Sequence, residues 1–501
     1  MKRYVKSLFV GGGTIISLMV LVSLVFSGLA NAVSYNPGPR ISFTFDDGLA
    51  SAYTLAAPTL AKYGLTGTDY VITGCVGMTT VPNTCLANTG TPYMTWAQIV
   101  ALQNTYSWDV GSHTVDHKCL ASNATADPED CQTATLTQAQ VITELSASQT
   151  ALAAQGIKAT DFSTPYGDYN NMVLAQIAKY YASMRGFQDQ NINGYPYSDY
   201  LLNDYVVLEK TTPVATVEAR IDQAIANNQW LVLTFHDIAA TPSQTPDNYQ
   251  YGTAELDQIA AYVQAKQTAG LIKNININQG LITSSTNLFA NGSFNNGIAD
   301  GWTTDDPTNI TANNGTNGSY PDPVNSVKLV SNTAGTATHL FSPKVAVNPN
   351  NTYVLKNFLN VQAITSGEVS FYIDEYNASG TWISGQYKTR EVSAFVEELN
   401  FNYTPSSVAV TQASLQVIVA GQGITAYLDN AQMFPDAAAV STLPATIAGD
   451  LNGDSIVNAA DLSLLLTNWN KTGATAAQGD LNSDGAVNAA DLSTLLTNWS
   501  K

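Results

Sequence analysis

Between residues 39 and about 282, short apolar runs alternate with longer stretches of helical periodicity. The apolar runs predict strands at 41–45, 68–73, 109–112 and 230–235, and another that opens at Phe162. The periodic stretches predict helices at 52–63, 95–104, 136–155, 171–181, 216–227 and 255–270. Strands that alternate with helices are typical of a parallel sheet or barrel. We therefore expect residues 39–282 to form one domain of this class.

The pattern changes after residue 287. From there to about 435 the chain is rich in Asn, Thr, Ser, Val and Tyr, and short alternating runs predict strands at 353–359, 368–376, 413–419 and 426–433. Many short strands joined by polar turns favour a β-sandwich. Residues 436–446 form a small linker that contains Ala, Ser and Pro.

The tail, residues 447–501, contains an internal repeat. The segment that starts at Gly449 returns at Gly479, and each copy runs into Leu-Leu-Thr-Asn-Trp. Each copy places Asp or Asn at positions 1, 3, 5, 9 and 12 of a loop, and this spacing of hard oxygen ligands is what calcium requires. One position in each loop would contribute its backbone carbonyl. The predicted calcium ligands are Asp450, Asn452, Asp454, Ile456, Asn458 and Asp461 in the first loop, and Asp480, Asn482, Asp484, Ala486, Asn488 and Asp491 in the second.

The first 32 residues read as a secretory signal peptide. A positive start with Lys2, Arg3 and Lys6 precedes an apolar run at 15–29, and the Ala-Asn-Ala sequence at 30–32 matches a cleavage site. The alternative is an uncleaved membrane anchor, although the run is short for a span. We therefore expect a secreted, extracellular protein, and attachment to a cell surface stays open.

Charge and cysteine content narrow the function classes. The formal net charge is -19 with only 12% charged residues, which argues against nucleic-acid binding. Four cysteines in an exported chain suggest two disulfides, and three pairings are possible. We favour Cys75–Cys85 and Cys119–Cys131, with free thiols as the alternative.

Three of the four histidines lie beside carboxylates or other polar groups. His113 and His117 are four residues apart, a spacing that places both imidazoles on one face of a helical turn, and His236 follows a predicted strand. Asp46 and Asp47 follow the first predicted strand, where their side chains would point apart and take different roles. Two histidines and a carboxylate suit zinc or a similar divalent ion. The alternative is a polar Asp-Asp-Gly turn and a pair of exposed or capping histidines.

These motifs resemble the polysaccharide deacetylase family, also called the NodB-homology domain or carbohydrate esterase family 4. The matching segments are Thr44–Gly48, His113–His117, Phe162–Gly167 and Phe235–Asp237. The resemblance implies an irregular (β/α) barrel that removes acetyl groups from polymeric sugars by attack of a metal-activated water. It implies that the metal ligands are Asp47, His113 and His117, that the general base is Asp46, that the general acid is His236, and that the oxyanion donor is the backbone N–H of Tyr166.

Two departures from the family pattern bear on this expectation. Ser163 stands where the third motif usually begins with an arginine that orients the base, and no clean aspartate–tryptophan pair forms the fourth motif. Arg185 is a candidate to replace the lost charge. A second hypothesis follows, in which the chain is a non-catalytic, glycan-binding or adhesive surface protein; the retained Asp46 and His236 argue against it.

The remaining regions also resemble known modules. The segments at 287–294, 301–302 and 426–431 resemble carbohydrate-binding modules of the galactose-binding-like sandwich type, which stack sugars on aromatic side chains. The candidates here are Tyr372, Tyr376, Trp382 and Tyr387. The duplicated loops resemble a type I dockerin, which binds cohesin modules on scaffold or surface proteins. The alternative for the sandwich is a spacer that binds no sugar. The alternative for the tail is a C-terminal module that calcium stabilises and that has no cohesin partner.

The expected protein is a secreted, metal-dependent polysaccharide deacetylase. Its substrate would be an acetylated polysaccharide that carries N- or O-acetyl groups. The expected metal in the barrel is zinc, with cobalt or nickel as alternatives, and the dockerin would hold calcium.

Overall fold

The computed structural model describes most of the chain, apart from several segments. The described residues are 37–78, 92–121, 136–187, 191–204, 206–243, 249–281, 287–313, 325–435, 451, 457, 459–472, 479–482, 485–497 and 499. The predicted signal peptide, the linker and the first loop's Asp450, Asn452, Asp454, Ile456 and Asn458, as well as Asp484, lie outside them. Cys75 and Cys119 are both disulfide-bonded. The pairing stays a prediction, because Cys85 and Cys131 are also outside.

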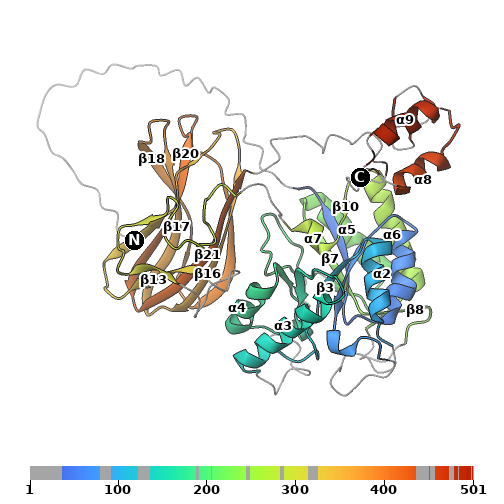
Figure 1. Cartoon of the computed structure of the whole chain (residues 1–501), viewed down its shortest axis with the longest axis horizontal. Helices are drawn as coiled ribbons and strands as arrows, with labels where there is room; N and C mark the ends of the chain where they lie inside the picture. The colour runs from blue at the N-terminus through green and yellow to red at the C-terminus, as the bar shows by residue number, and fades with distance from the viewer. Residues whose placement is uncertain are drawn as a thin grey trace, which may run out of the picture.

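The first domain is built on a parallel sheet whose strands alternate with helices. Its strand order is β5-β4-β3-β2-β1-β7-β6. β10 pairs with the start of β1, at Arg40 and Ile41, and β2 pairs with its end, from Phe43 to Phe45. The strands are β1 (Arg40–Phe45), β2 (Gly67–Val71), β3 (Asp109–Ser112), β4 (Asp161–Ser163), β5 (Ser183–Arg185), β6 (Val206–Val207), β7 (Trp230–Phe235) and β10 (Lys273–Asn274). Among the described residues no strand pairing joins β5 to β6, so the sheet is open there, in agreement with the predicted irregular (β/α) barrel. Figure 1 shows the helices of this domain around the sheet.

Helices connect and cover these strands. They are α1 (Ala57–Ala61), α2 (Trp96–Tyr106), α3 (Gln138–Ala153), α4 (Asn171–Tyr180), α5 (Val214–Asn227), α6 (Thr253–Thr268) and α7 (Ile277–Gly280). The single helix predicted at 52–63 is split into a π-helix, η1 (Ala52–Ala56), and α1. Capping boxes at Thr95 and Thr137 start α2 and α3. The apolar faces of these helices pack on Phe43, Phe45 and other buried strand residues to form one core.

Residues from 287 to 435 form a sandwich of two antiparallel sheets. One sheet has the order β12-β13-β21-β16-β19, and the other β11-β14-β20-β17-β18 with β15 beside β20. The first comprises β12 (Ile310–Asn313), β13 (Ser326–Ser331), β21 (Ile424–Pro435), β16 (Tyr353–Ala363) and β19 (Phe395–Tyr403). The second comprises β11 (Thr303–Thr304), β14 (Ala337–Phe341), β20 (Gln412–Gln422), β17 (Ser366–Tyr376), β18 (Trp382–Glu391) and β15 (Val345–Ala346). Their inner faces share a second apolar core, as the sandwich prediction requires.

The sandwich docks directly on the barrel through the outer face of its β16–β19–β21 sheet. The ring of Phe358 meets that of Tyr200 edge-on at 5.2 Å, and Phe358 belongs to the barrel's apolar core. Lys356 is buried at this contact, where its ammonium bonds the carboxylate of Asp199 and lies 3.8 Å from Glu398. The Asp199 N–H also donates to Glu398 at 2.8 Å. The two domains therefore share one packed interface in addition to their chain connection.

Replacing Lys356 by Met should destabilise this interface. The change leaves the carboxylates of Asp199 and Glu398 buried without their cation, a loss that costs about 3 kcal/mol in comparable buried pairs. Denaturant unfolding of the full chain should reveal the lower stability. Lys328→Met, on another strand of the same sheet, is the matched control and should change stability by less than about 0.5 kcal/mol. Equal stability of both variants would contradict the structural role given to Lys356.

The tail contains α8 (Ala459–Thr467) and α9 (Ala489–Thr497). Val457, Leu465, Val487 and Leu495 form a small buried cluster between the two repeats. This arrangement fits the predicted small, duplicated helical module. Within the part of the chain that the structure describes, no helix is long and apolar enough to cross a membrane.

Candidate active site

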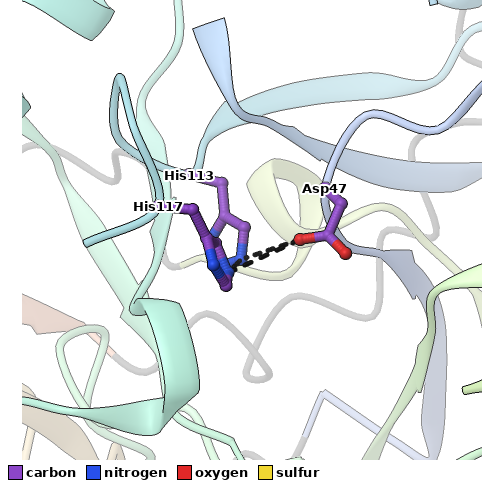
Figure 2. Close-up of side chains that lie close together, drawn as sticks. All are labelled: Asp47, His113 and His117. Atoms are coloured by element: carbon purple, nitrogen blue, oxygen red, sulfur yellow. Dashed lines mark hydrogen bonds and ion pairs between the residues drawn. The ribbon is translucent and has the colours of Figure 1, made fainter. Parts of the chain in front are cut away.

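Two adjacent carboxylates leave the C-terminal end of β1 in different directions. Asp47 has a left-handed backbone (φ 77°), as does the following Gly48 (φ 72°), so the chain turns sharply at the strand end. The Oδ1 atom of Asp47 lies 3.6 Å from Nε2 of His113 and 3.5 Å from Nε2 of His117 (Figure 2). Asp46 instead contacts Arg185. The expectation that the two carboxylates would have separate surroundings agrees with this geometry.

The two histidines converge from a loop, which corrects the expected helical turn. Thr114 and His117 both have a left-handed backbone, with φ values of 69° and 55°, so no helix can form there. The loop is instead tied by side chains. The Thr114 hydroxyl accepts the N–H of His117 at 2.9 Å, and the buried Glu144 carboxylate accepts the N–H groups of Val115 and Asp116 at 3.0 and 3.1 Å. Sequence spacing alone did not indicate the part played by Glu144.

The donor set at this loop fits a divalent metal. The Nδ1 of His113 lies 2.8 Å from the carbonyl oxygen of Ser163, which can only accept, so Nδ1 carries the proton and Nε2 presents a lone pair. The Nε2 atoms of His113 and His117 are 3.1 Å apart. Burial lowers the pKa of both histidines, and two neutral nitrogens this close are stabilised by a cation between them. One ligand atom from each of Asp47, His113 and His117 lies within 4.8 Å of the others.

Asp46 is held by a buried arginine. Burial alone would raise its pKa, but the guanidinium of Arg185 and nearby histidines bring the pKa of Asp46 below its ordinary value. Asp46 is therefore an anion at neutral pH, which is the form a general base needs. The sequence offers Arg185 as a replacement for the arginine absent at position 163. The structure brings Arg185 and Ser163 together, with Nη2 of Arg185 donating to Oγ of Ser163 at 2.6 Å.

His236 follows β7 between two aromatic rings. Tyr249 stacks on its imidazole with ring centres 4.9 Å apart, and Phe187 meets it edge-on at 5.7 Å. Burial lowers the pKa of His236 to about 4, although Asp46 opposes this shift. Neither aromatic residue could be found from the sequence, because neither falls in a motif and each comes from a different loop.

Tyr166 lies at the end of β4, next to the histidine pair. Its backbone is left-handed (φ 58°), and its ring lies 4.6 Å from that of His117. Such a conformation is uncommon for a residue with a side chain and is typical of functional sites. The role of its backbone N–H as an oxyanion donor stays a prediction.

Comparison with known protein families decides the class of this domain. Residues 34–184 match the family model described as polysaccharide deacetylase. The first part of the barrel is therefore similar to polysaccharide deacetylases. Residues 448–498 match the model described as dockerin type I domain. The predicted deacetylase and dockerin are both confirmed, and the enzyme is a carbohydrate deacetylase by class.

Several solved structures are similar to parts of this chain. A family 4 carbohydrate esterase from Streptomyces lividans in complex with acetate is 18% identical and covers 46% of this chain and 89% of its own, with a TM-score of 0.27. The Xyl-CE4 domain of a multidomain xylanase from the hindgut metagenome of Trinervitermes trinervoides is 15% identical, covers 48% and 89%, and has a TM-score of 0.29. A family 16 carbohydrate-binding module is 21% identical and covers 30% and 99%, with a TM-score of 0.24. No curated protein matches.

In the sandwich of the deacetylase, the four aromatic residues singled out from the sequence lie together. Strand register places Tyr372 opposite Tyr387 and Tyr376 opposite Trp382 on β17 and β18. Trp382 is 58% exposed and Tyr387 52% exposed. Nε1 of Trp382 donates to Asp374 at 3.1 Å, and the ammonium of Lys344 lies 3.7 Å from the ring centre of Tyr376. We call the set Tyr372, Tyr376, Trp382 and Tyr387 the aromatic platform.

In the dockerin, the described ligand candidates lie close to the helix starts. Asp461, Asp480 and Asp491 are buried. Asp491 accepts the N–H groups of Leu481 and Asn488, both at 2.8 Å, and Asp480 accepts that of Gly485 at 2.9 Å. Asp461 accepts the N–H of Leu451 at 2.7 Å, so both repeats use their last aspartate in the same way. Asn482, Ala486 and Asn488 also lie in the described part of the second loop.

Proposed function

We propose that this chain is a secreted, metal-dependent deacetylase that removes acetyl groups from an extracellular polysaccharide. The observation that carries this proposal is the convergence of Asp47, His113 and His117 in one buried cluster. Asp46 and His236, which the family resemblance makes base and acid, follow the neighbouring strands β1 and β7. A binding site would have no need for either group.

Asp47, His113 and His117 would hold the metal, with zinc as the first choice and cobalt or nickel as alternatives. When bound, such an ion lowers the pKa of water and polarises a carbonyl group. Asp46, kept ionised by Arg185, would accept the proton of the attacking water. His236 is neutral in the free protein because burial lowers its pKa, so it would have to take up a proton before it gives one to the leaving oxygen or nitrogen of the sugar. The N–H of Tyr166 would stabilise the negative oxygen.

Acetate release from acetylated xylan and from N-acetylglucosamine oligomers, measured side by side with added zinc or cobalt, tests this function. Release from xylan identifies an esterase, and release from the oligomers identifies an amidase. No release from either substrate by a chain with bound metal would instead support the non-catalytic, glycan-binding hypothesis. The non-catalytic hypothesis rests mainly on Ser163, which stands where the family usually has the arginine that orients the base. Because Arg185 places a positive charge beside Ser163, this support for the hypothesis is weaker.

The aromatic platform suits a polysaccharide chain. Exposed aromatic faces beside polar groups such as Asp374 and Gln416 can stack on sugar rings and bond their hydroxyls, and Gln416 lies opposite Tyr372 in β20. The platform is on the β17–β18–β20 sheet, whereas the barrel packs on the other sheet of the sandwich. The platform is therefore open to a polymer while the two domains stay docked.

Trp382→Ala should weaken binding to an insoluble acetylated polysaccharide about tenfold, because one aromatic contact contributes about 1.4 kcal/mol. Activity on short soluble oligomers should not change. A pull-down isotherm and a soluble assay measure the two effects. Leu271→Ala, which changes a 44% exposed apolar residue of the deacetylase domain, is the control and should bind normally. Unaltered polymer binding by the Trp382 variant would favour the spacer interpretation.

The dockerin would attach the enzyme to a cohesin-bearing scaffold or surface protein. Exposed leucines on its two helices, Leu464 and Leu466 on α8 and Leu496 on α9, offer apolar contacts for such a partner. Calcium would be the folding cofactor, since two buried carboxylates in the second loop lie in its predicted ligand set.

Chelation should therefore unfold the tail selectively. Removing divalent ions from the full chain is expected to make residues 447–501 sensitive to limited proteolysis while the barrel and sandwich resist, because metal binding supplies folding free energy to small modules. Added calcium should restore the resistance, and added zinc alone should not. Equal resistance of the tail before and after chelation would rule out calcium as its folding cofactor.

A further inference from the structure

Arg185 is a fully buried cation in the described part of the barrel. It has no exposed surface, and its Nη2 donates to both carboxylate oxygens of Asp46 and to Ser163 Oγ. Nη1 donates to Thr234 Oγ1 at 3.0 Å and to the carbonyl of Gly186 at 2.8 Å. A buried guanidinium with this many partners has a single orientation.

A second carboxylate lies behind the guanidinium. Oδ2 of Asp204, which is fully buried, is 3.6 Å from Nη1 of Arg185. The ring of Tyr70 lies 5.2 Å from the guanidinium carbon on another side. Arg185 therefore bridges Asp46 and Asp204, and the two anions balance a charge that would otherwise be costly to bury.

The strand register explains how this arginine reaches Asp46. Ser163 on β4 pairs directly with Arg185 on β5, so the two side chains project from the same face of the sheet. The small Ser163 side chain leaves room for the guanidinium to pass and offers it an acceptor. An arginine at position 163 would compete for the same space and the same carboxylate.

We propose that Arg185 is the positioning residue for Asp46 and that Asp204 anchors it, so that this deacetylase supplies the orienting cation from β5 rather than from β4. This inference rests on the proposed function of Asp46 as the base. The arginine could then stand at position 163 on β4 or at position 185 on β5, provided that the side chain at the other position is small.

The test compares Arg185→Ala, Arg185→Lys, Asp204→Asn and the double variant Ser163→Arg/Arg185→Ala in the full chain. We expect Arg185→Ala to lower kcat about 10²-fold, with KM and zinc affinity within about threefold of the parent, since misplacing a reacting group costs about that much. The double variant should regain at least about tenfold of the lost kcat, because it returns a guanidinium to Asp46 from the neighbouring strand. Arg40→Met, which alters a bonded arginine at the opposite end of β1, should keep the parent kcat.

The outcomes separate this inference from the proposed function. If the parent chain releases no acetate, the proposed function fails. If the parent is active and Arg185→Ala keeps its kcat, or loses zinc together with kcat and is not rescued by Ser163→Arg, the inference is overturned. Should Arg185→Ala not fold, Arg185→Lys and Asp204→Asn decide: a kcat about tenfold lower or more with zinc binding intact supports the positioning role, and an unchanged kcat overturns it.

Discussion

Asp46→Asn should lower kcat for acetate release by about 10³-fold, within the range that a positioned general base contributes. Asparagine has nearly the same shape and still offers one oxygen to Arg185, but it cannot accept a proton from water. Because Asp47, His113 and His117 are unchanged, zinc should bind as in the parent chain. Steady-state kinetics and a zinc titration measure the two quantities.

The control for this variant is Asp257→Asn. Asp257 is a surface carboxylate that bonds Lys62 far from the cluster, and its loss should leave kcat unchanged. Parental kcat in the Asp46 variant would show that another group takes the proton. A joint loss of kcat and zinc would show that Asp46 belongs to the metal site instead.

His117→Ala should weaken zinc binding about 10³-fold, because one ligand carries a share of the roughly 10–16 kcal/mol that a complete zinc site supplies. Acetate release at limiting zinc should fall at least as far. The bound metal per chain after dialysis, together with activity across a zinc series, gives both effects. Excess zinc should restore part of the activity if the other two ligands remain in place.

His339→Ala provides the matched control. His339 is the only one of the four histidines outside the active-site motifs, and it pairs with Asp305 on the sandwich. Its loss should change neither the zinc content nor the rate. A full zinc complement in the His117 variant would contradict the ligand set of Asp47, His113 and His117.

The sequence was most informative where chemistry and local pattern coincide. Asp46, Asp47 and His236 end apolar strands of a parallel sheet, so their approach to one edge follows from the fold class. The HxxxH spacing indicated that His113 and His117 act together but suggested a helix. The loop conformation depends on the carboxylate of Glu144, a residue 27 positions beyond His117, and spacing carries no information about such a partner.

The features that escaped prediction depend on contacts between distant segments. Arg185 meets Asp46 across 139 positions and Lys356 meets Asp199 across 157, so only the folded chain brings each pair together. Edge strands were missed for a different reason. β18 (Trp382–Glu391) is exposed or half-exposed along its length and includes Gly385, so it lacks the alternation that marks a strand with one buried face.

The sandwich of the deacetylase has two outer faces with different surroundings. One covers Tyr200 of the barrel, and the other carries the aromatic platform. Packed sheets lie about 10 Å apart, so the platform is one sheet farther from the barrel. A polysaccharide strand bound by the platform would lie on the side of the sandwich remote from the barrel, so the catalytic centre would remain free to engage a different strand. On a solid such as a plant wall or a biofilm, this geometry would favour deacetylation of the strands next to the one that the platform binds. The bound strand would hold the enzyme at the surface without itself being the substrate.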